Sequence, residues 1–390
     1  MLTENICGVN PTNALHIGHY YAVALGRWSG VTAAMDHWSI RTQYAGCQVT
    51  IVSAPGAESV DTRTAFQARV TQVAHWGSRR SNLVPHPWKL HKAMRGFDVL
   101  VLHEGWTVSH YVAAAVARFS RIPYVVMPHG VYEPAIQRDL RGPRRLRLAC
   151  ERWFLAGAAA AHIFFDSEQP LVHAVSPATR TFTAPTGAPF SGTVAATEGR
   201  SDVVLWFGRI DVRHKGLDLL LEALALVPPS GRPHMRLAGY DYQGGHKQLT
   251  ELIDRLGLHA WVDVTGPILG EAKQSALANA GVYVHPSRWE CHSIALLEAL
   301  ASGVPALVGR GAHISALLDD TGAAMIVDGT VEAWADALAQ LPLRDTHIDR
   351  ALLWEKLSWD RAVQVTVSSY RRMSSQHQQR RGRFSIRRRR

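Results

Sequence analysis

The chain has 390 residues, a length that corresponds to about two domains of 100–200 residues each. Hydrophobic residues make up 47% and charged residues 19%, which excludes a wholly disordered chain. The four cysteines lie far apart without a C-x-x-C pair, so neither a disulfide scaffold nor a zinc ribbon is expected. No apolar run reaches the roughly 18 residues of a membrane-spanning helix, and the first residues lack the basic and apolar regions of a secretory signal. We therefore expect a cytoplasmic protein.

The net charge of +10 is concentrated in one segment. Residues 371–390 contain nine arginines and no acidic residue, which leaves about +1 (10 − 9) for residues 1–370. A body this close to neutral does not favour a nucleic-acid-binding protein, because such proteins need an extended basic surface. We expect residues 374–390 to be a disordered basic tail of a composition that suits an anionic surface.

Strand-like and helical patterns alternate along both halves of the chain. In the first half we expect strands at Gly46–Ser53, Asp98–His103, Ile122–Met127 and Ala161–Phe165, and helices at Ala33–Tyr44, Val108–Phe119 and from Pro143. In the second half we expect strands at Val203–Phe207, Met235–Ala238, Val262–Thr265, Val282–His285, Pro305–Val308 and Ala324–Val327, and helices at Leu217–Leu226, Leu249–Leu256, Glu271–Ala280 and Ser293–Ser302. Strands separated by helices are typical of parallel sheets, so we predict an α/β protein with two tandem Rossmann-like domains.

A segment without periodic apolar residues separates the two alternating regions. Residues 185–201 are rich in proline, glycine, threonine and serine, as linkers are. We place the first domain at residues 1–190, the linker at 191–200 and the second domain at 201–354. Ligands of such sheets bind beyond the carboxyl ends of the strands, so we expect a nucleotide on one domain and a second substrate on the other.

The second domain carries a candidate anion site at the start of a helix. A loop with Glu290 precedes a helix that we expect to begin after the capping residue Ser293. The amides of Ser293, Ile294 and Ala295, with the positive end of the helix, would suit a diphosphate. Glu290 and Glu298 would then accept hydroxyl groups of a sugar and a ribose. Two solvated glutamates on a capped helix remain the alternative.

A second segment of the same domain provides positive charge. It follows the expected strand Val203–Phe207 and contains Gly208, Arg209 and Lys215. Gly208 permits close approach of a ligand to the backbone. Arg209 and Lys215 would stabilise the charge that grows on a departing diphosphate. Taken alone, the two residues are equally compatible with solvated loop cations.

Together these segments resemble the retaining glycosyltransferases of family 4, which have the GT-B fold. The resemblance rests on Gly208-Arg209…Lys215-Gly216, followed by Pro286-Ser287…Glu290…Glu298. It implies that Arg209 and Lys215 bind the donor diphosphate and that Glu290 contacts the transferred sugar. It further implies that Glu298 contacts the ribose and that the backbone near Ile268 lies beside the base. No cofactor is expected besides the nucleotide diphosphate sugar as donor substrate, and no metal is expected because Arg209, Lys215 and the helix terminus would neutralise the diphosphate.

One short segment departs from the family pattern. Where the family has Gly-Phe-Gly after the first glutamate, this chain has Cys291-His292-Ser293. These larger side chains would narrow the sugar pocket or change its polarity. The identity of the donor sugar therefore stays open, and a catalytically weak sugar-binding protein of GT-B fold remains an alternative.

The first domain offers candidates for the acceptor side. His103 and His129 both follow expected strands, and Pro128–Pro134 resembles a Pro-His-Gly-x-x-Glu-Pro pattern of members that build bacterial polysaccharides. Gly30 lies where the family has its opening glycine loop. A histidine at a strand end can hydrogen-bond sugar hydroxyls. We name His129 with Glu290 as catalytic candidates, and His103 and Gly30 as acceptor-side residues.

A basic segment of the first domain suggests contact with a membrane. Residues Arg138–Trp153 contain six arginines together with apolar residues at helical spacing. A basic amphipathic helix can lie on an anionic membrane, and acceptors in the resembled family are often lipid-linked. The resemblance also implies that residues 355–373 form a helix that returns to the first domain.

The main hypothesis is therefore transfer of a hexose-type sugar from a nucleotide diphosphate sugar to a glycan or lipid-linked acceptor with retention. The expected setting is polysaccharide or glycoconjugate biosynthesis at the inner face of the plasma membrane. A different class of enzyme stays open, because His16-Ile17-Gly18-His19 resembles the ATP-binding segment of class I aminoacyl-tRNA synthetases. A phosphorylase or an epimerase on the same fold is a further alternative.

Overall fold

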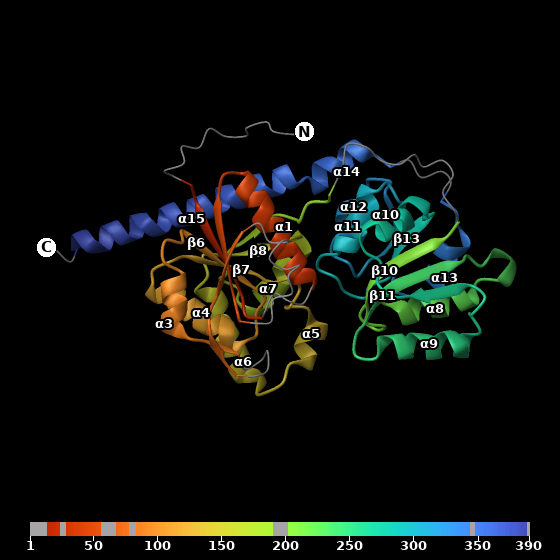
Figure 1. Cartoon of the computed structure of the whole chain (residues 1–390), viewed down its shortest axis with the longest axis horizontal. Helices are drawn as coiled ribbons and strands as arrows, with labels where there is room; N and C mark the ends of the chain where they lie inside the picture. The colour runs from red at the N-terminus through yellow and green to blue at the C-terminus, as the bar shows by residue number, and fades with distance from the viewer. Residues whose placement is uncertain are drawn as a thin grey trace. The chain divides into compact units, whose positions relative to one another are not determined.

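The computed structural model describes residues 14–23, 29–55, 68–77, 83–189, 202–343 and 348–387, with side chains up to residue 379. The chain forms two compact units (Figure 1). Unit 1 contains Met1–Thr186 and Trp359–Arg390, and unit 2 contains Gly187–Ser358. The whole of the linker expected at 191–200, together with residues 190 and 201, lies outside the described residues.

Unit 1 is built around a seven-stranded sheet with the order β3-β2-β1-β6-β7-β8-β9. The strands are β1 (His16–Tyr21), β2 (Gln48–Ser53), β3 (Arg69–Gln72), β6 (Val99–His103), β7 (Tyr124–Met127), β8 (Ala160–Ile163) and β9 (Thr181–Thr183). All neighbouring strands pair in parallel. A short antiparallel pair joins β4 (His75–Trp76) to β5 (Val84–Pro85). The helices are α1 (Gly30–Tyr44), α3 (Pro87–Ala93), α4 (Val108–Phe119), α5 (Pro134–Asp139), α6 (Arg144–Ala156), α7 (Gln169–Val175) and α15 (Trp359–Arg387).

The central strand β1 is absent from the sequence-based prediction. Its residues His16–Tyr21 are the segment that resembles a tRNA synthetase, and two histidines make the segment look polar. The structure instead buries it: Ile17 is fully buried and His19 is 1% exposed. His16 reaches the hydroxyl of Thr50 on β2, with 2.9 Å between Nε2 and Oγ1. The segment therefore forms the middle of a sheet and does not form a nucleotide-binding loop.

Unit 2 is a second parallel sheet, with the order β12-β11-β10-β13-β14-β15. Its strands are β10 (Val204–Ile210), β11 (Met235–Asp241), β12 (Val262–Thr265), β13 (Val282–His285), β14 (Ala306–Gly309) and β15 (Ala324–Val327). Its helices are α8 (Leu217–Leu226), α9 (Gly245–Leu256), α10 (Gly270–Asn279), α11 (Ile294–Ala301), α12 (Ser315–Leu318), α13 (Val331–Ala339) and α14 (Arg350–Leu357). The prediction of two Rossmann-like α/β domains is confirmed.

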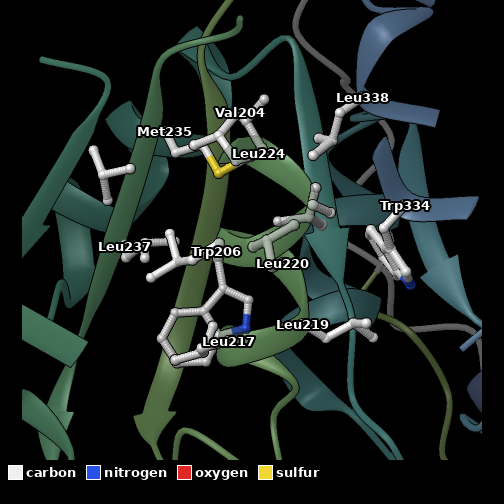
Figure 2. Packing of buried hydrophobic residues seen from close by; sticks show 14 of the residues in the cluster. Val204, Trp206, Leu217, Leu219, Leu220, Leu224, Met235, Leu237, Trp334 and Leu338 are labelled. Atoms are coloured by element: carbon white, nitrogen blue, oxygen red, sulfur yellow. The ribbon is translucent and has the colours of Figure 1, made fainter. Parts of the chain in front are cut away.

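The core of unit 2 explains why its first strand and helix were readily predicted. Figure 2 shows Val204 and Trp206 of β10 beside Leu220 of α8, with Trp334 of α13 on the other side of that helix. Helix α8 is leucine-rich on nearly every face because it lies between the sheet and α13. Burying one such side chain stabilises the fold by roughly 1.5–3 kcal/mol. This core fixes the end of β10, where the candidate site begins.

The C-terminal helix returns to unit 1, as expected from the family resemblance. Helix α15 packs through Trp359 on Trp38, with 5.1 Å between the ring centroids, and through Tyr370 on Phe182. The expected disorder from residue 374 is wrong, because α15 continues to Arg387 (Figure 1). Arginine, glutamine and methionine favour helices, and extending a helix that packing has already nucleated costs little. No helix in the described ranges is long and apolar enough to cross a membrane.

Candidate functional site

The donor-side candidates of unit 2 meet where the strand order reverses. Strand β10 lies between β11 and β13, so the loops after β10 and β13 leave the same edge of the sheet side by side. Such switch points are where open α/β sheets bind ligands. Gly208 and Arg209 lie near the end of β10, Lys215 lies in the following loop, and Glu290 follows β13. The structure therefore brings together two segments that are about 80 residues apart in the sequence.

Close packing of the two loops requires a glycine at position 216. Gly216 caps α8 with φ at +65°. A Cβ atom there would lie 2.0 Å from the carbonyl oxygen of Pro286, which excludes every other residue. A backbone hydrogen bond of 3.1 Å, from the amide of Arg288 to the carbonyl of His214, also joins the loops. The glycine of the Lys-Gly motif thus has a structural reason.

Lys215 and Glu290 form an ion pair at the junction of these loops. The ammonium Nζ donates to the carboxylate Oε2, and the two side chains are only 16% and 13% exposed. Burial alone would raise the pKa of Glu290, but the charge of Lys215, with His214 and His285, brings that pKa down to about 2. Glu290 is therefore ionised at neutral pH. A phosphate that binds Lys215 would compete with this carboxylate for the ammonium group.

Arg209 is held in place by a group of polar and aromatic side chains. His214 donates from Nε2 to the carbonyl of Trp289 at 2.9 Å, and its Nδ1 then accepts from Arg209 Nη2 at 3.1 Å. The guanidinium also lies 3.5 Å from Asp211 Oδ2 and 4.2 Å from the ring centroid of Tyr242. Its side chain remains 31% exposed. Arg209 is thus a preoriented cation with room for an anionic ligand.

The remaining donor-side residues lie at the same edge. Ser293 caps α11 as predicted, since its Oγ accepts from the amide of Leu296 at 3.3 Å, so Ile294 and Ala295 open the helix. Ile268 is partly buried in the loop after β12. Glu298 pairs with Lys273 of α10, with 2.6 Å between Oε1 and Nζ. Sequence reasoning missed Lys273, because no local signal relates it to a residue 25 positions away.

The acceptor-side histidines also lie at a reversal of strand order. Strand β1 lies between β2 and β6. His103 ends β6, His129 lies just after β7, and 2.8 Å separate His103 Nδ1 from His129 Nε2. His19 of β1, which the sequence analysis named only in the segment that resembles a tRNA synthetase, lies 2.8 Å from His103 through its Nδ1. Gly30 is the exposed first residue of α1, and a Cβ atom there would meet nothing within 4 Å.

A buried carboxylate connects the two loops that carry these histidines. Glu151 of α6 has no exposed surface and accepts from the hydroxyl of Tyr132 at 2.6 Å and of Tyr111 at 2.7 Å. It also accepts from the amide of Trp106 at 3.0 Å. Burial raises the pKa of Glu151 to about 7 although these donors favour its charged form. Sequence reasoning missed it. The one available signal was an acidic residue in a segment rich in arginine.

The same two loops contain strained backbone. Glu104, Trp106 and His129 have φ angles of +77°, +61° and +52°. Residues other than glycine adopt such angles only where the surroundings enforce them, and these residues concentrate at functional sites. Gly105 between them has no room for a side chain, because a Cβ atom would lie 2.4 Å from Glu151 Oε1. The backbone around His103 and His129 is therefore held in a strained conformation by its surroundings, as is common at functional sites.

Comparisons with known proteins agree with this architecture. Residues 28–182 match the domain family described as Glycosyltransferase Family 4, and residues 201–343 match the one described as Glycosyl transferases group 1. The chain belongs to the family-4-like glycosyltransferases of GT-B fold. Both matches are to glycosyltransferases, and the segment His16–Tyr21 forms a sheet strand in place of an ATP-binding loop, so the tRNA-synthetase alternative is wrong.

Individual relatives match parts of the chain. An O-antigen chain mannosyltransferase B of Escherichia coli is 26% identical over 43% of this chain and 45% of its own length. The chain spans less than half the length of the first curated relatives it matches. A GDP-mannose:cellobiosyl-diphosphopolyprenol alpha-mannosyltransferase of Xanthomonas oryzae is 27% identical over 77% of this chain and 80% of its own length. The crystal structure of Anabaena HepE with UDP and glucose has a TM-score of 0.72 at 16% identity, covering 91% of this chain and 99% of HepE.

Proposed function

We propose that this protein transfers a hexose-type sugar from a nucleotide diphosphate sugar to a glycan or lipid-linked acceptor, with retention of configuration. The observation that carries the proposal is the grouping of Arg209, Lys215 and Glu290 at the start of α11, at the switch point of the unit 2 sheet. The relatives named as mannosyltransferases and the UDP complex of HepE support it. Polysaccharide or glycoconjugate biosynthesis is the setting we propose.

The side chains have distinct roles in this proposal. Arg209 and Lys215 bind the diphosphate, together with the first amides of α11, and stabilise the charge of the leaving group. Glu298 binds the ribose, and the backbone near Ile268 lies beside the base. The positive charge that the diphosphate needs comes from the protein itself, so the proposal assigns no metal and no cofactor.

Donor binding rearranges the ion pair in this scheme. When a phosphate takes over Lys215, the carboxylate of Glu290 loses its partner and becomes available to hydroxyl groups of the sugar. Because the pKa of Glu290 is about 2 in the paired state, this carboxylate is ionised when the donor arrives, and hydroxyl groups of the sugar then replace Lys215 as its hydrogen-bond donors. The exchange links recognition of the diphosphate to recognition of the sugar. Cys291 and His292, beside Glu290, would then shape the sugar pocket.

A panel of UDP-, GDP- and ADP-sugars, tested for thermal stabilisation and for transfer to lipid-linked acceptors, tests the proposal.

Two variants then test the roles of the glutamates, with the nucleotide of the best donor as ligand. Glu298→Gln should weaken binding of this nucleotide about tenfold, the size of one charge-assisted hydrogen bond. Glu290→Gln should reduce transfer but should not weaken binding of the free nucleotide, because the nucleotide lacks the sugar. The exposed Glu251, changed to glutamine, is the matched control. Equal nucleotide affinity in all three variants would contradict the ribose assignment.

Helix α6 supports a proposal that the protein binds an anionic membrane surface. Leu146 and Trp153 are 61% and 42% exposed and lie seven residues apart, on one face of the helix. Arg144 and Arg145 are exposed at its start, and Arg118 lies 5.3 Å from the ring centroid of Trp153. Exposed apolar anchors among arginines are typical of helices that lie at a membrane interface. We place this contact at the inner face of the plasma membrane.

Vesicle flotation distinguishes the contribution of helix α6 to membrane binding from that of the basic C-terminal segment. Each arginine near an anionic surface contributes about 1 kcal/mol, and salt screens much of it. Removing residues 380–390 deletes seven arginines and should weaken vesicle binding at low salt only. Leu146→Ser with Trp153→Ser should weaken binding at every salt concentration, because apolar insertion is not screened. Unchanged flotation of the double variant would exclude α6 as the anchor.

A further inference from the structure

Three histidines from three neighbouring strands form a continuous chain of ring nitrogens in unit 1. His19 lies on β1, His103 ends β6, and His129 lies in the loop after β7, across the reversal of strand order. His19 Nδ1 is 2.8 Å from His103 Nε2, and His103 Nδ1 is 2.8 Å from His129 Nε2. Both nitrogens of the central ring are therefore engaged by its neighbours.

The two inner rings are neutral, so their protons are coupled. His19 is 1% exposed and His103 is fully buried. Burial lowers the pKa of His19 to about 3 and that of His103 well below its ordinary value. A neutral imidazole has one N–H and one lone pair. In a chain of neutral rings, the position of the hydrogen on the first ring fixes the position on the next.

His19, at the inner end of the row of histidines, determines the direction in which the hydrogen bonds are donated. His19 Nε2 is buried and has no hydrogen-bond partner among the described residues. A buried N–H without an acceptor is rarer in proteins than an unused lone pair, so Nε2 carries the lone pair and Nδ1 carries the hydrogen. His19 then donates to His103 Nε2. His103 in turn donates from Nδ1 to His129 Nε2.

We propose that His19 and His103 are positioning residues that hold His129 as the Nδ1–H tautomer, with its Nε2 already accepting a hydrogen bond. In this state Nδ1 of His129 carries the hydrogen and Nε2 already accepts a hydrogen bond, so the ring suits the role of a hydrogen-bond donor to a sugar and not that of a general base. The role of His129 toward a sugar rests on the proposed function, whereas the assignment of its tautomer does not. The left-handed backbone of His129, with φ at +52°, fits a ring whose orientation the fold enforces.

Nitrogen-15 NMR of labelled histidine side chains tests the tautomer directly, because Nδ1–H and Nε2–H rings give different shift pairs. The signal of His129 is assigned as the one that disappears in His129→Gln. We expect an Nδ1–H signal in the unchanged full-length protein at pH 7.5. An Nε2–H ring or a charged ring at His129 would overturn the inference. This measurement needs no substitution in the buried part of the chain.

Two variants at position 19 test whether the hydrogen-bonded row of three histidines sets the tautomer of His129. In His19→Asn the amide N–H can replace the Nδ1–H of histidine and keep the direction of the chain. In His19→Leu the direction is no longer fixed, so His129 should show a mixed or reversed tautomer. We expect kcat to fall about tenfold in the leucine variant, the size of one hydrogen bond, and to be largely restored in the asparagine variant. The KM for the donor should not change in either. A leucine variant that keeps the wild-type tautomer would overturn the proposed role of His19.

The outcomes separate this inference from the proposed function. An Nδ1–H ring in a protein that transfers no sugar would overturn the proposed function and support the tautomer assignment. An Nε2–H ring in an active glycosyltransferase would overturn the inference and leave the function standing. Equal loss of kcat in the asparagine and leucine variants, with the tautomer unchanged, would show a merely structural effect and contradict the positioning role.

Discussion

Replacing Lys215 with methionine should reduce sugar transfer by about 10²–10³-fold, the usual effect of removing one group that stabilises transition-state charge. Lys215 would contact the diphosphate in the donor complex, and it compensates Glu290 in the free protein, where the pair is nearly buried. The variant should also be less stable by about 3 kcal/mol, because Glu290 keeps its buried charge without a partner. Transfer rates and denaturant unfolding measure the two effects separately.

The stability effect has a defined pH dependence. The pKa of Glu290 is lowered to about 2 in the folded protein, so the stabilising contribution of the pair is present above the ordinary carboxyl pKa and is lost as the pH falls towards 2. Without Lys215, burial remains and raises that pKa instead. Lys215→Met should therefore lose most stability relative to wild type at pH 7 and least at pH 4.

Two further variants serve as controls for Lys215→Met. Lys247 is 82% exposed beside Glu251, and its change to methionine should alter neither transfer nor stability measurably. Adding Glu290→Gln to Lys215→Met removes the unpaired charge and should recover most of the lost stability, while transfer stays low. A double variant as unstable as the single one would show that the cost does not come from the buried carboxylate.

Replacing Glu151 with alanine should destabilise unit 1 by about 3 kcal/mol or more. The change leaves the hydroxyls of Tyr111 and Tyr132 and the amide of Trp106 buried without their acceptor, and it opens a cavity. Denaturant unfolding followed by circular dichroism gives the size of the effect. Because Glu151 connects the loops of His103 and His129, transfer should also fall in the protein that remains folded.

Glu151→Gln separates the charge of this residue from its shape. The folded pKa of Glu151 is about 7, above its ordinary value of 4.5, so the folded state binds a proton more tightly than the unfolded state. The wild-type protein should therefore lose up to about 3 kcal/mol of stability between pH 4.5 and 8 from this group. The glutamine variant lacks this loss and should be the more stable protein at pH 8. Parallel pH profiles of the two proteins would contradict the assignment.

Elements with strong local signals were predicted with their correct limits. Helices α4 and α8 and strands β12, β13 and β15 begin and end at the predicted residues. Their apolar periodicity, and the glycine or polar residue at their ends, are properties of the adjacent sequence. The donor-side motif belongs to the same category, because Gly216 and Ser293 occupy helix caps that local chemistry defines.

Elements that depend on distant partners were missed. Strand β1 contains histidines that look polar in sequence, and their partners lie in neighbouring strands, Thr50 for His16 and His103 for the buried His19. The extension of α15 beyond residue 374 follows from a helix nucleated by packing of Trp359 and Tyr370 on unit 1. Neither partner is recognisable from the segment itself.

The sequence by itself therefore determined the two-domain α/β architecture, the family and the residues at the donor-side edge. Only the tertiary structure decided which charges are already paired, since Lys215 with Glu290 and Lys273 with Glu298 meet through strand order. The same holds for the chain from His19 to His129 and for the carboxylate of Glu151. Hydrogen bonds and ion pairs act over a few ångströms, and the register of parallel strands, rather than spacing along the chain, sets those distances.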